Sequence, residues 1–160
     1  MDGGIEAVRA SYRPKWIKTL FVGESAPHSG KFFYIGDTAM LRYMRRAVDL
    51  ALGESDDFLE SFKVYGWYLD DLVLTPVNKM AKPERKAKCL GARKSLADRI
   101  VEYQPEAIVS LLLFIKPFVD EAAKIASCDV PRYAVPFPGM GQQARFQTAM
   151  ASLIPKLLKL

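Results

Sequence analysis

The chain has 160 residues, of which 50% are hydrophobic and 26% are charged. This composition is typical of one globular domain with a real core, and it excludes a disordered chain. No apolar run approaches the roughly 20 residues that a membrane-spanning helix needs. Residues 1–11 carry Asp2 and Glu6 and lack the apolar stretch of a signal peptide. We therefore expect a cytosolic (cytoplasmic) protein that does not bind membranes.

Cysteine and histidine are rare in this chain. Cys89 and Cys128 lie far apart in sequence, and His28 is its one histidine. Disulfide frameworks, zinc or iron–sulfur sites and multi-histidine metal centres need more of these residues. We expect two ordinary buried or half-buried thiols, no metal and no other cofactor.

Positive charge is in excess and is concentrated in one stretch. Lysine and arginine number 23 against 18 acidic residues, so the net charge is +5, which is modest evidence for a polyanionic partner. Residues 79–94 contain a single opposing residue, Glu84. A solvated helix face and a phosphate-binding face explain this stretch about equally well. Its basic residues are Lys79, Lys82, Arg85, Lys86, Lys88, Arg93 and Lys94.

Taken in chain order, the predicted elements alternate between strand and helix. The first is an apolar strand, Thr19–Gly23, that ends at a glycine. Asp37 is expected to cap a helix over Thr38–Leu52 that Gly53 stops. The later strands are predicted at Trp67–Leu74, Ala107–Leu112 and Arg132–Val135, and the later helices at Asp56–Tyr65, Pro83–Tyr103, Pro117–Ser127 and Gln142–Leu158, the last bent or broken near Pro155.

Strands that alternate with helices of about ten or more residues indicate a parallel sheet with helices on both faces. We expect residues 1–160 to form one three-layer α/β/α domain around a central four-stranded parallel sheet. Ligands bind such sheets in the crevice beyond the carboxyl ends of the strands. Three loops should line that crevice: Gly23–Gly36, Asp70–Lys82 and Pro136–Gly141.

The first loop carries a carboxylate and three aromatic residues. Glu24 follows directly on the first strand. Loops are normally exposed, so aromatic residues in them either pack on the core or serve as stacking surfaces. Of Phe32, Phe33 and Tyr34, we expect two in the core and one as a stacking platform.

The second loop begins with two carboxylates in an apolar strand. The strand period of two should turn either Asp70 or Asp71 inward. A buried carboxylate is costly unless it has a hydrogen-bond donor or a catalytic task. A helix cap or a backbone-satisfied aspartate explains the pair about as well as a functional role.

The third loop precedes a helix, and backbone N–H groups at helix N-termini attract phosphate. This segment is either a phosphate site or a plain structural turn. Its candidate contacts are Gly139, Gly141, Gln142, Gln143 and Arg145.

These segments, in this order, resemble the motifs of the uracil-DNA glycosylase superfamily. Gly23–His28 is similar to its strand-Gly-(Gln/Glu) motif, and Gly30–Gly36 to the segment whose phenylalanine stacks on a flipped base, which favours Phe33. Tyr68–Thr75 is similar to the strand whose last residue reads the base edge, and Val135–Pro138 to the loop that enters the minor groove. The resemblance implies that family's fold and the excision of a base from DNA. The cysteines that hold an iron–sulfur cluster in one branch are missing.

Three positions depart from the family pattern. Ser25 stands at a catalytic aspartate, Val135 at a motif histidine, and Asp71 at the asparagine that reads the base. An asparagine amide both donates and accepts hydrogen bonds, whereas an ionised aspartate only accepts. Asp71 therefore favours a base with an exocyclic amine, such as cytosine or a modified cytosine.

The resemblance and the chemistry together assign each candidate a role. Glu24 would orient water or stabilise the cationic sugar during glycosidic cleavage, and His28 would be a second acid or a phosphate contact. The remaining candidates are Phe33, Ser25, Asp70 and Asp71 at the flipped base, and Lys79, Lys82 and Arg85, with the contacts of the third loop, at DNA phosphates.

We therefore expect a monomeric DNA glycosylase-like enzyme that acts on a damaged or modified base in single- or double-stranded DNA and associates with the nucleoid when bound. Two alternatives stay open. One is a non-catalytic protein that binds nucleic acid or a nucleotide on the same fold, and the other is a hydrolase of small nucleosides. DNA binding should weaken steeply with salt, whereas nucleoside binding should not.

Overall fold

The computed structural model describes residues 2–160 and contains a sheet of four parallel strands. The strands lie in the order β2-β1-β3-β4, and each pairs in parallel with its neighbour. The prediction of an α/β chain with a four-stranded parallel sheet is confirmed. The strands are β1 (Thr19–Gly23), β2 (Trp67–Asp71), β3 (Ala107–Ser110) and β4 (Arg132–Ala134).

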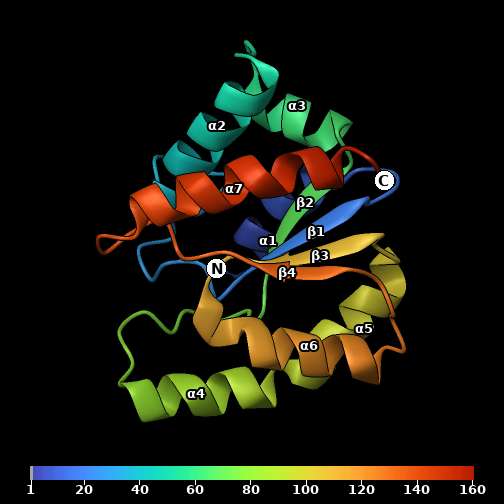
Figure 1. Ribbon diagram of the computed structural model, residues 1–160. Coiled ribbons are helices and arrows are strands. Elements are labelled where there is room, and N and C mark those ends of the chain that lie inside the picture. Colours follow the sequence, from blue (N-terminus) through green and yellow to red (C-terminus); the bar gives the residue numbers. More distant parts are fainter. Residues whose placement is uncertain (1) are drawn as a thin grey trace.

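Helices cover both faces of this sheet (Figure 1). β1, β2 and β3 are buried along their whole length, as expected for parallel strands that are enclosed on two sides. One group of helices is α2 (Ala39–Leu52), α3 (Phe58–Val64) and α7 (Gln143–Leu157), and the other is α4 (Lys82–Gly91), α5 (Arg93–Tyr103), a 3-10 turn at Leu113–Ile115 and α6 (Lys116–Ile125).

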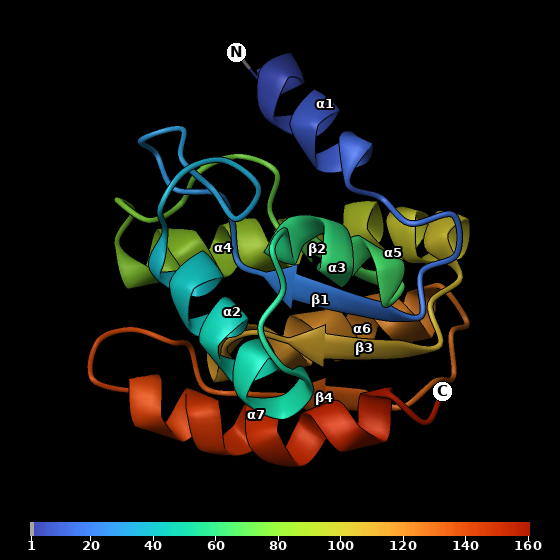
Figure 2. The same cartoon turned by 90° about the horizontal axis from the view of Figure 1, so that it is seen from above.

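An additional helix, α1 (Asp2–Ser11), precedes the first strand and is not among the predicted elements. It lies beyond β2, the edge strand of the sheet (Figure 2). Arg9 donates a hydrogen bond to the carbonyl oxygen of Leu69 at 3.3 Å, and the Leu69 N–H donates to the Tyr34 hydroxyl at 2.8 Å. Because unpaired backbone groups on an edge strand invite pairing with other chains, α1 and Tyr34 protect this edge.

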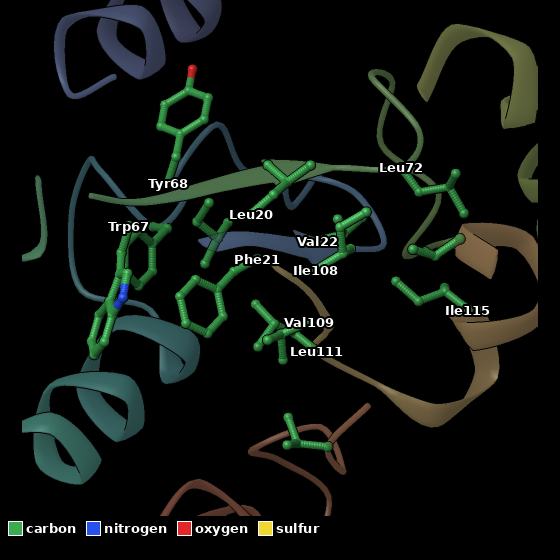
Figure 3. Close-up of a cluster of buried hydrophobic side chains, with 14 of the residues drawn as sticks. Leu20, Phe21, Val22, Trp67, Tyr68, Leu72, Ile108, Val109, Leu111 and Ile115 are labelled. Carbon is green, nitrogen blue, oxygen red and sulfur yellow. The ribbon is translucent and has the colours of Figure 1, made fainter. Parts of the chain in front are cut away.

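The core lies on both sides of β2. Trp67 packs edge-on against Phe21 of β1 and Phe62 of α3, with ring centroids 5.7 and 5.6 Å apart. Figure 3 shows Tyr68 on the opposite side of the strand from Trp67, in the direction of α1. Burial of each such side chain contributes about 1.5–3 kcal/mol, so both layers hold the strand in place.

The prediction of a single helix over Pro83–Tyr103 is wrong, because a turn at Ala92 divides this segment into α4 and α5. Cys89 is the buried residue of α4, whereas α5 packs an apolar face against α6. Gly91, a poor helix former, lies at the junction. The turn allows the apolar residues of α5 to reach the core, namely Leu96, Ala97 and Ile100.

Other element ends differ from prediction by a few residues. β2 ends at Asp71 rather than Leu74, because its last partner in β1 is Gly23. The last helix is not broken at Pro155. A proline removes one backbone hydrogen bond of a helix, and buried side chains on both sides of it keep α7 continuous, namely Leu153, Ile154 and Leu157.

Of the two predicted ends of α2, the C-terminal one is confirmed and the N-terminal cap is not. Thr38, rather than Asp37, caps its start, because the Thr38 hydroxyl accepts a hydrogen bond from the Leu41 N–H at 3.2 Å. Asp37 instead pairs with Arg42 on the surface at 2.9 Å. Gly53 ends the helix as predicted, with a left-handed φ of 90°.

Two smaller expectations concern thiols and membranes. Both cysteines are free, as predicted, with Cys89 buried and Cys128 half-buried. Across residues 2–160, no helix has the length and apolar character to cross a membrane.

Candidate functional site

A pocket of about 280 Å³ opens at the carboxyl ends of β1 and β2. Figure 2 shows the loops that follow β1, β2 and β4 on this same side of the sheet, beyond the strand arrowheads. Each of the three predicted loops contributes to its wall, and the first turn of α2 and Leu112, after β3, complete it. This volume lies at the small end of ligand pockets. Residues from the three loops that line it include Glu24, Ser25, Phe33, Asp71, Asn78 and Phe137.

Glu24 stands half-buried on the rim of the pocket, directly after β1. Both of its carboxylate oxygens accept hydrogen bonds from Arg85 of α4, at 3.1 Å from Nε and 2.5 Å from Nη2. The hydrogen bond with Glu24 raises the pKa of the Arg85 guanidinium. A two-pronged arginine–carboxylate pair fixes orientation as well as charge. Arg85, a candidate DNA contact, therefore holds Glu24 in position.

Cys89 lies behind this pair, with its Sγ 3.9 Å from a Glu24 oxygen. Burial, aided by the Glu24 charge, raises the pKa of the Cys89 thiol to about 11. The thiolate is the reactive form of cysteine. Cys89 is therefore a neutral packing residue near neutral pH, in line with the expectation of an ordinary thiol.

Asp71 is buried in the wall of the pocket and reaches across to β1. Its Oδ2 accepts a hydrogen bond from Arg9 Nη2 at 3.0 Å. Its Oδ1 lies against Gly23, its partner in the β1–β2 ladder, where an added Cβ would be 2.6 Å from that oxygen. The glycine that ends β1 therefore makes room for a carboxylate in the pocket wall.

Burial sets the titration of Asp71. Desolvation raises the pKa of this carboxyl to about 6, although the Arg9 charge acts in the opposite direction and Asp70 acts in the same one. Asp71 is therefore mostly ionised near neutral pH, and a modest fall in pH protonates it.

Asp70 is also buried, so the expectation that only one of the two aspartates points inward is wrong. The period of two holds, but α1 and α5 enclose the second face. The Asp70 carboxylate pairs with Arg99 at 2.9 Å and accepts a hydrogen bond from the Tyr103 hydroxyl at 3.0 Å. Asp70, expected at the base, does not line the pocket and instead joins β2 to α5.

The three loop aromatics are all buried, so the expected division into two core residues and one stacking platform does not hold. Phe33 packs against Phe62 and Tyr34, with ring centroids 5.2 and 5.0 Å apart. Both Phe32 and Phe33 nevertheless line the pocket. The core therefore supplies the apolar wall of the site.

Ser25 and His28 join the first loop to the second. The Ser25 hydroxyl accepts a hydrogen bond from the Val77 N–H at 3.2 Å, and the His28 N–H donates to Asn78 Oδ1 at 3.0 Å. Ser25 lines the pocket, whereas the His28 side chain is exposed outside it. Asn78 is a pocket residue that sequence analysis misses, although its place in the second predicted loop is a usable signal.

The third loop places Phe137 in the pocket wall and Met140 in solvent. Gly139 is required by packing, because a Cβ there would lie 2.8 Å from the Phe137 ring. Met140, 95% exposed, has a left-handed φ of 52° next to Gly141. No polar feature of the sequence singles out Met140. The other candidate contacts lie outside the pocket, namely Lys79 before α4, Lys82 at its first position, and Gln142, Gln143 and Arg145 at the start of α7.

Comparison with known proteins adds no assignment. The chain matches no protein-family model, and no curated protein matches its sequence. In the part of the chain that the structure describes, no three acidic, histidine or cysteine side chains are placed to hold a metal ion.

Proposed function

We propose that this chain is a DNA glycosylase-like protein that takes a flipped base into the pocket and hydrolyses its glycosidic bond, on a uracil-DNA glycosylase-like form of the α/β fold. One observation carries the proposal. The four sequence segments that resemble that superfamily come from three separate regions of the chain, residues 23–36, 68–75 and 135–138, and each contributes to one pocket. The contributing residues include Glu24 and Ser25, Phe32 and Phe33, Leu69 and Asp71, and Phe137.

The pocket chemistry favours an amino-bearing base. Phe32 and Phe33 provide apolar surface for a planar ring. Asp71, ionised near neutral pH, accepts a hydrogen bond from an exocyclic amine but repels the carbonyl oxygen at the same position of uracil. A modified cytosine is therefore the preferred class of substrate.

Glu24 is the group best suited to the chemical step. In hydrolysis, the bond between the sugar carbon and the base nitrogen breaks, water oxygen bonds to that carbon, and the water proton leaves to the departing base. Positive charge develops on the sugar as the base departs. The Glu24 carboxylate, held by Arg85, would stabilise this charge and orient the water.

The third loop and the start of α7 are suited to the DNA strand beside the pocket. Met140 is an exposed apolar side chain on a short loop, and such side chains can wedge between base steps. Lys79 and Lys82 are exposed in the second loop, where they would neutralise phosphates. Replacing Met140 by alanine should weaken DNA binding several-fold and leave the free energy of unfolding within about 0.5 kcal/mol.

The test is a base-release assay on oligonucleotides that carry cytosine, modified cytosines, uracil, hypoxanthine or an oxidised pyrimidine. We expect release of one amino-bearing base, a loss of about 100-fold or more in Glu24→Gln, and unchanged release in Lys124→Gln, an exposed control on α6. Asp71→Asn should shift preference towards uracil. Release that is equal in Glu24→Gln and the unmodified protein would contradict the catalytic role.

A non-catalytic binder is the second candidate, and one observation favours it. Both Glu24 oxygens already accept hydrogen bonds from Arg85, so the positive charge of Arg85 offsets the negative charge of Glu24. DNA binding that weakens steeply with salt, with no release from any oligonucleotide, would support this candidate. Release from a free nucleoside without salt dependence would instead support a nucleoside hydrolase.

A further inference from the structure

The N-terminal helix contributes a buried charge to the pocket wall. Arg9 is 2% exposed, and its guanidinium is surrounded by acceptors. It contacts Asp71 at 3.0 Å, Asp70 at 3.6 Å and Glu6 of its own helix at 3.3 Å. The Phe32 ring, which also lines the pocket, packs against the guanidinium, with its centroid 5.2 Å from the central carbon of Arg9. α1 is thus part of the candidate site although none of its residues lines the pocket directly.

Arg9 holds one oxygen of Asp71 and leaves the other free. Oδ2 receives the Arg9 hydrogen bond, whereas Oδ1 lies against Gly23. Among the residues that the structure describes, none donates a hydrogen bond to Oδ1. Because Asp71 and Gly23 both line the pocket, this oxygen is the acceptor that Asp71 can offer to a ligand.

The acidic groups around Asp71 oppose its ionisation. Asp70, the preceding residue of β2, and Glu6 of α1 are both acidic and both favour the protonated form. Arg99 of α5 donates to the main-chain oxygen of Asp71 at 2.7 Å, and its charge is paired with Asp70. Arg9 is therefore the group that favours the carboxylate form of Asp71.

We propose that Arg9 is a positioning residue that sets the base preference of the pocket, because it keeps Asp71 an ionised acceptor whose free oxygen reads an exocyclic amine. Loss of the Arg9 charge, or a fall in pH, converts Asp71 into a carboxylic acid. That form both donates and accepts, as an asparagine amide does, and it suits a carbonyl-bearing base such as uracil. This inference rests on the proposed function for the identity of the ligand.

The first test follows the Asp71 carboxyl directly, without substrate. Its ¹³C resonance, assigned by comparison with Asp71→Asn, is titrated in the unmodified protein, Arg9→Met, Arg9→Lys and Arg13→Met. Burial places the pKa of Asp71 at about 6 with Arg9 present. We expect Asp71 to bind its proton at least tenfold more tightly in Arg9→Met. The change should be smaller in Arg9→Lys, which keeps the positive charge but lacks the planar guanidinium group.

Arg13→Met is the matched control. Arg13 follows α1, and it pairs on the surface with Glu102 at 3.3 Å, away from Asp71. The titration midpoint of Asp71 in Arg13→Met should equal that in the unmodified protein. An Asp71 midpoint that is the same in Arg9→Met and the unmodified protein would overturn the proposal, whatever base is released.

The second test measures release of an amino-bearing base relative to uracil at two pH values. The ratio should fall by about tenfold between pH 7.5 and pH 5, as the ionised fraction of Asp71 does, and it should not vary with pH in Asp71→Asn. If Arg9→Met does not fold, the proposal is tested by the Asp71 titration in Arg9→Lys and by the release ratio in the unmodified protein. A release ratio that does not change with pH overturns the proposal. A shifted Asp71 midpoint without release of any base supports the control of Asp71 by Arg9 and counts against the glycosylase.

Discussion

Two arginine–carboxylate pairs flank the pocket, and they differ in burial. Glu24 and Arg85 are 13% and 33% exposed at their side chains, whereas Asp71 and Arg9 are 7% and 2% exposed. The first pair stands on the rim, with its arginine from α4. The second lies in the wall, with its arginine from α1. One pocket therefore combines an ion pair that is partly exposed to solvent with one that is buried.

Burial decides how much each pair matters to the fold. An exposed ion pair contributes between about 0 and 1 kcal/mol, because water screens it and two long side chains lose freedom. A buried pair gains little overall, but removing one partner leaves a charge in the interior. Arg9 also contacts three acceptors besides Asp71. The wall pair should therefore tolerate substitution far less than the rim pair.

Loss of the buried arginine should have the largest effect on the free energy of unfolding. Arg9→Met should lower the free energy of unfolding by about 3–5 kcal/mol near neutral pH, because the buried carboxyl groups of Asp70 and Asp71 lose the cation that compensates their burial. Arg85→Met, the matched change on the rim, should cost about 1 kcal/mol or less. Urea unfolding of both variants measures the difference. Equal losses would contradict the contrast between wall and rim.

The second effect is a pH dependence that belongs to the wall pair. The pKa of Asp71 in the folded protein is raised from 3.8 to about 6, so between these values the folded state binds more protons than the unfolded state. The free energy of unfolding should therefore fall as pH rises from about 4 to about 6, by up to about 3 kcal/mol.

Asp71→Asn should remove that part of the pH slope. Unfolding curves of both proteins across this window isolate the Asp71 contribution as a difference. The same slope in Asp71→Asn would show that other groups cause it.

A third, smaller effect concerns the space that β1 leaves for Asp71. Gly23→Ala places a Cβ 2.6 Å from Asp71 Oδ1, and Arg9 prevents the carboxylate from moving freely. We expect a loss of about 1–3 kcal/mol from overpacking. Gly91→Ala is the control, since a Cβ there meets no atom within 4 Å and alanine favours the helix. Thermal unfolding of the two variants should move in opposite directions.

The smallest effect is the response of each pair to salt. A double-mutant cycle on Glu24 and Arg85 should give a coupling of about 0.5 kcal/mol that disappears near 1 M salt, where screening extends to about 3 Å. The cycle on Arg9 and Asp71 should give a larger coupling that salt changes little. Equal salt responses of the two pairs would place both in the same solvent environment.

Much of this architecture can be read from local patterns. Apolar strands such as Thr19–Gly23, separated by helical segments, indicate a parallel sheet. The carboxyl ends of parallel strands meet at one edge, so the sequence places Glu24 and Asp71 near one crevice, and both do line one pocket. These predictions succeed because they depend on residues close in the chain and on one general rule of topology.

The missed features depend on contacts between distant residues. Arg9 and Asp71 are 62 positions apart, and no periodicity in residues 1–11 signals that a buried arginine will meet a carboxylate there. The burial of Asp70 depends on its contact with α5. The break at Ala92 depends on which side chains α5 can bury. The chain pattern predicts that Asp70 and Asp71 lie in one strand and point to its opposite faces. Packing of α1 and α5 around that strand determines that one faces the pocket and the other the interior, because each carboxylate must lie beside the arginine that compensates its burial.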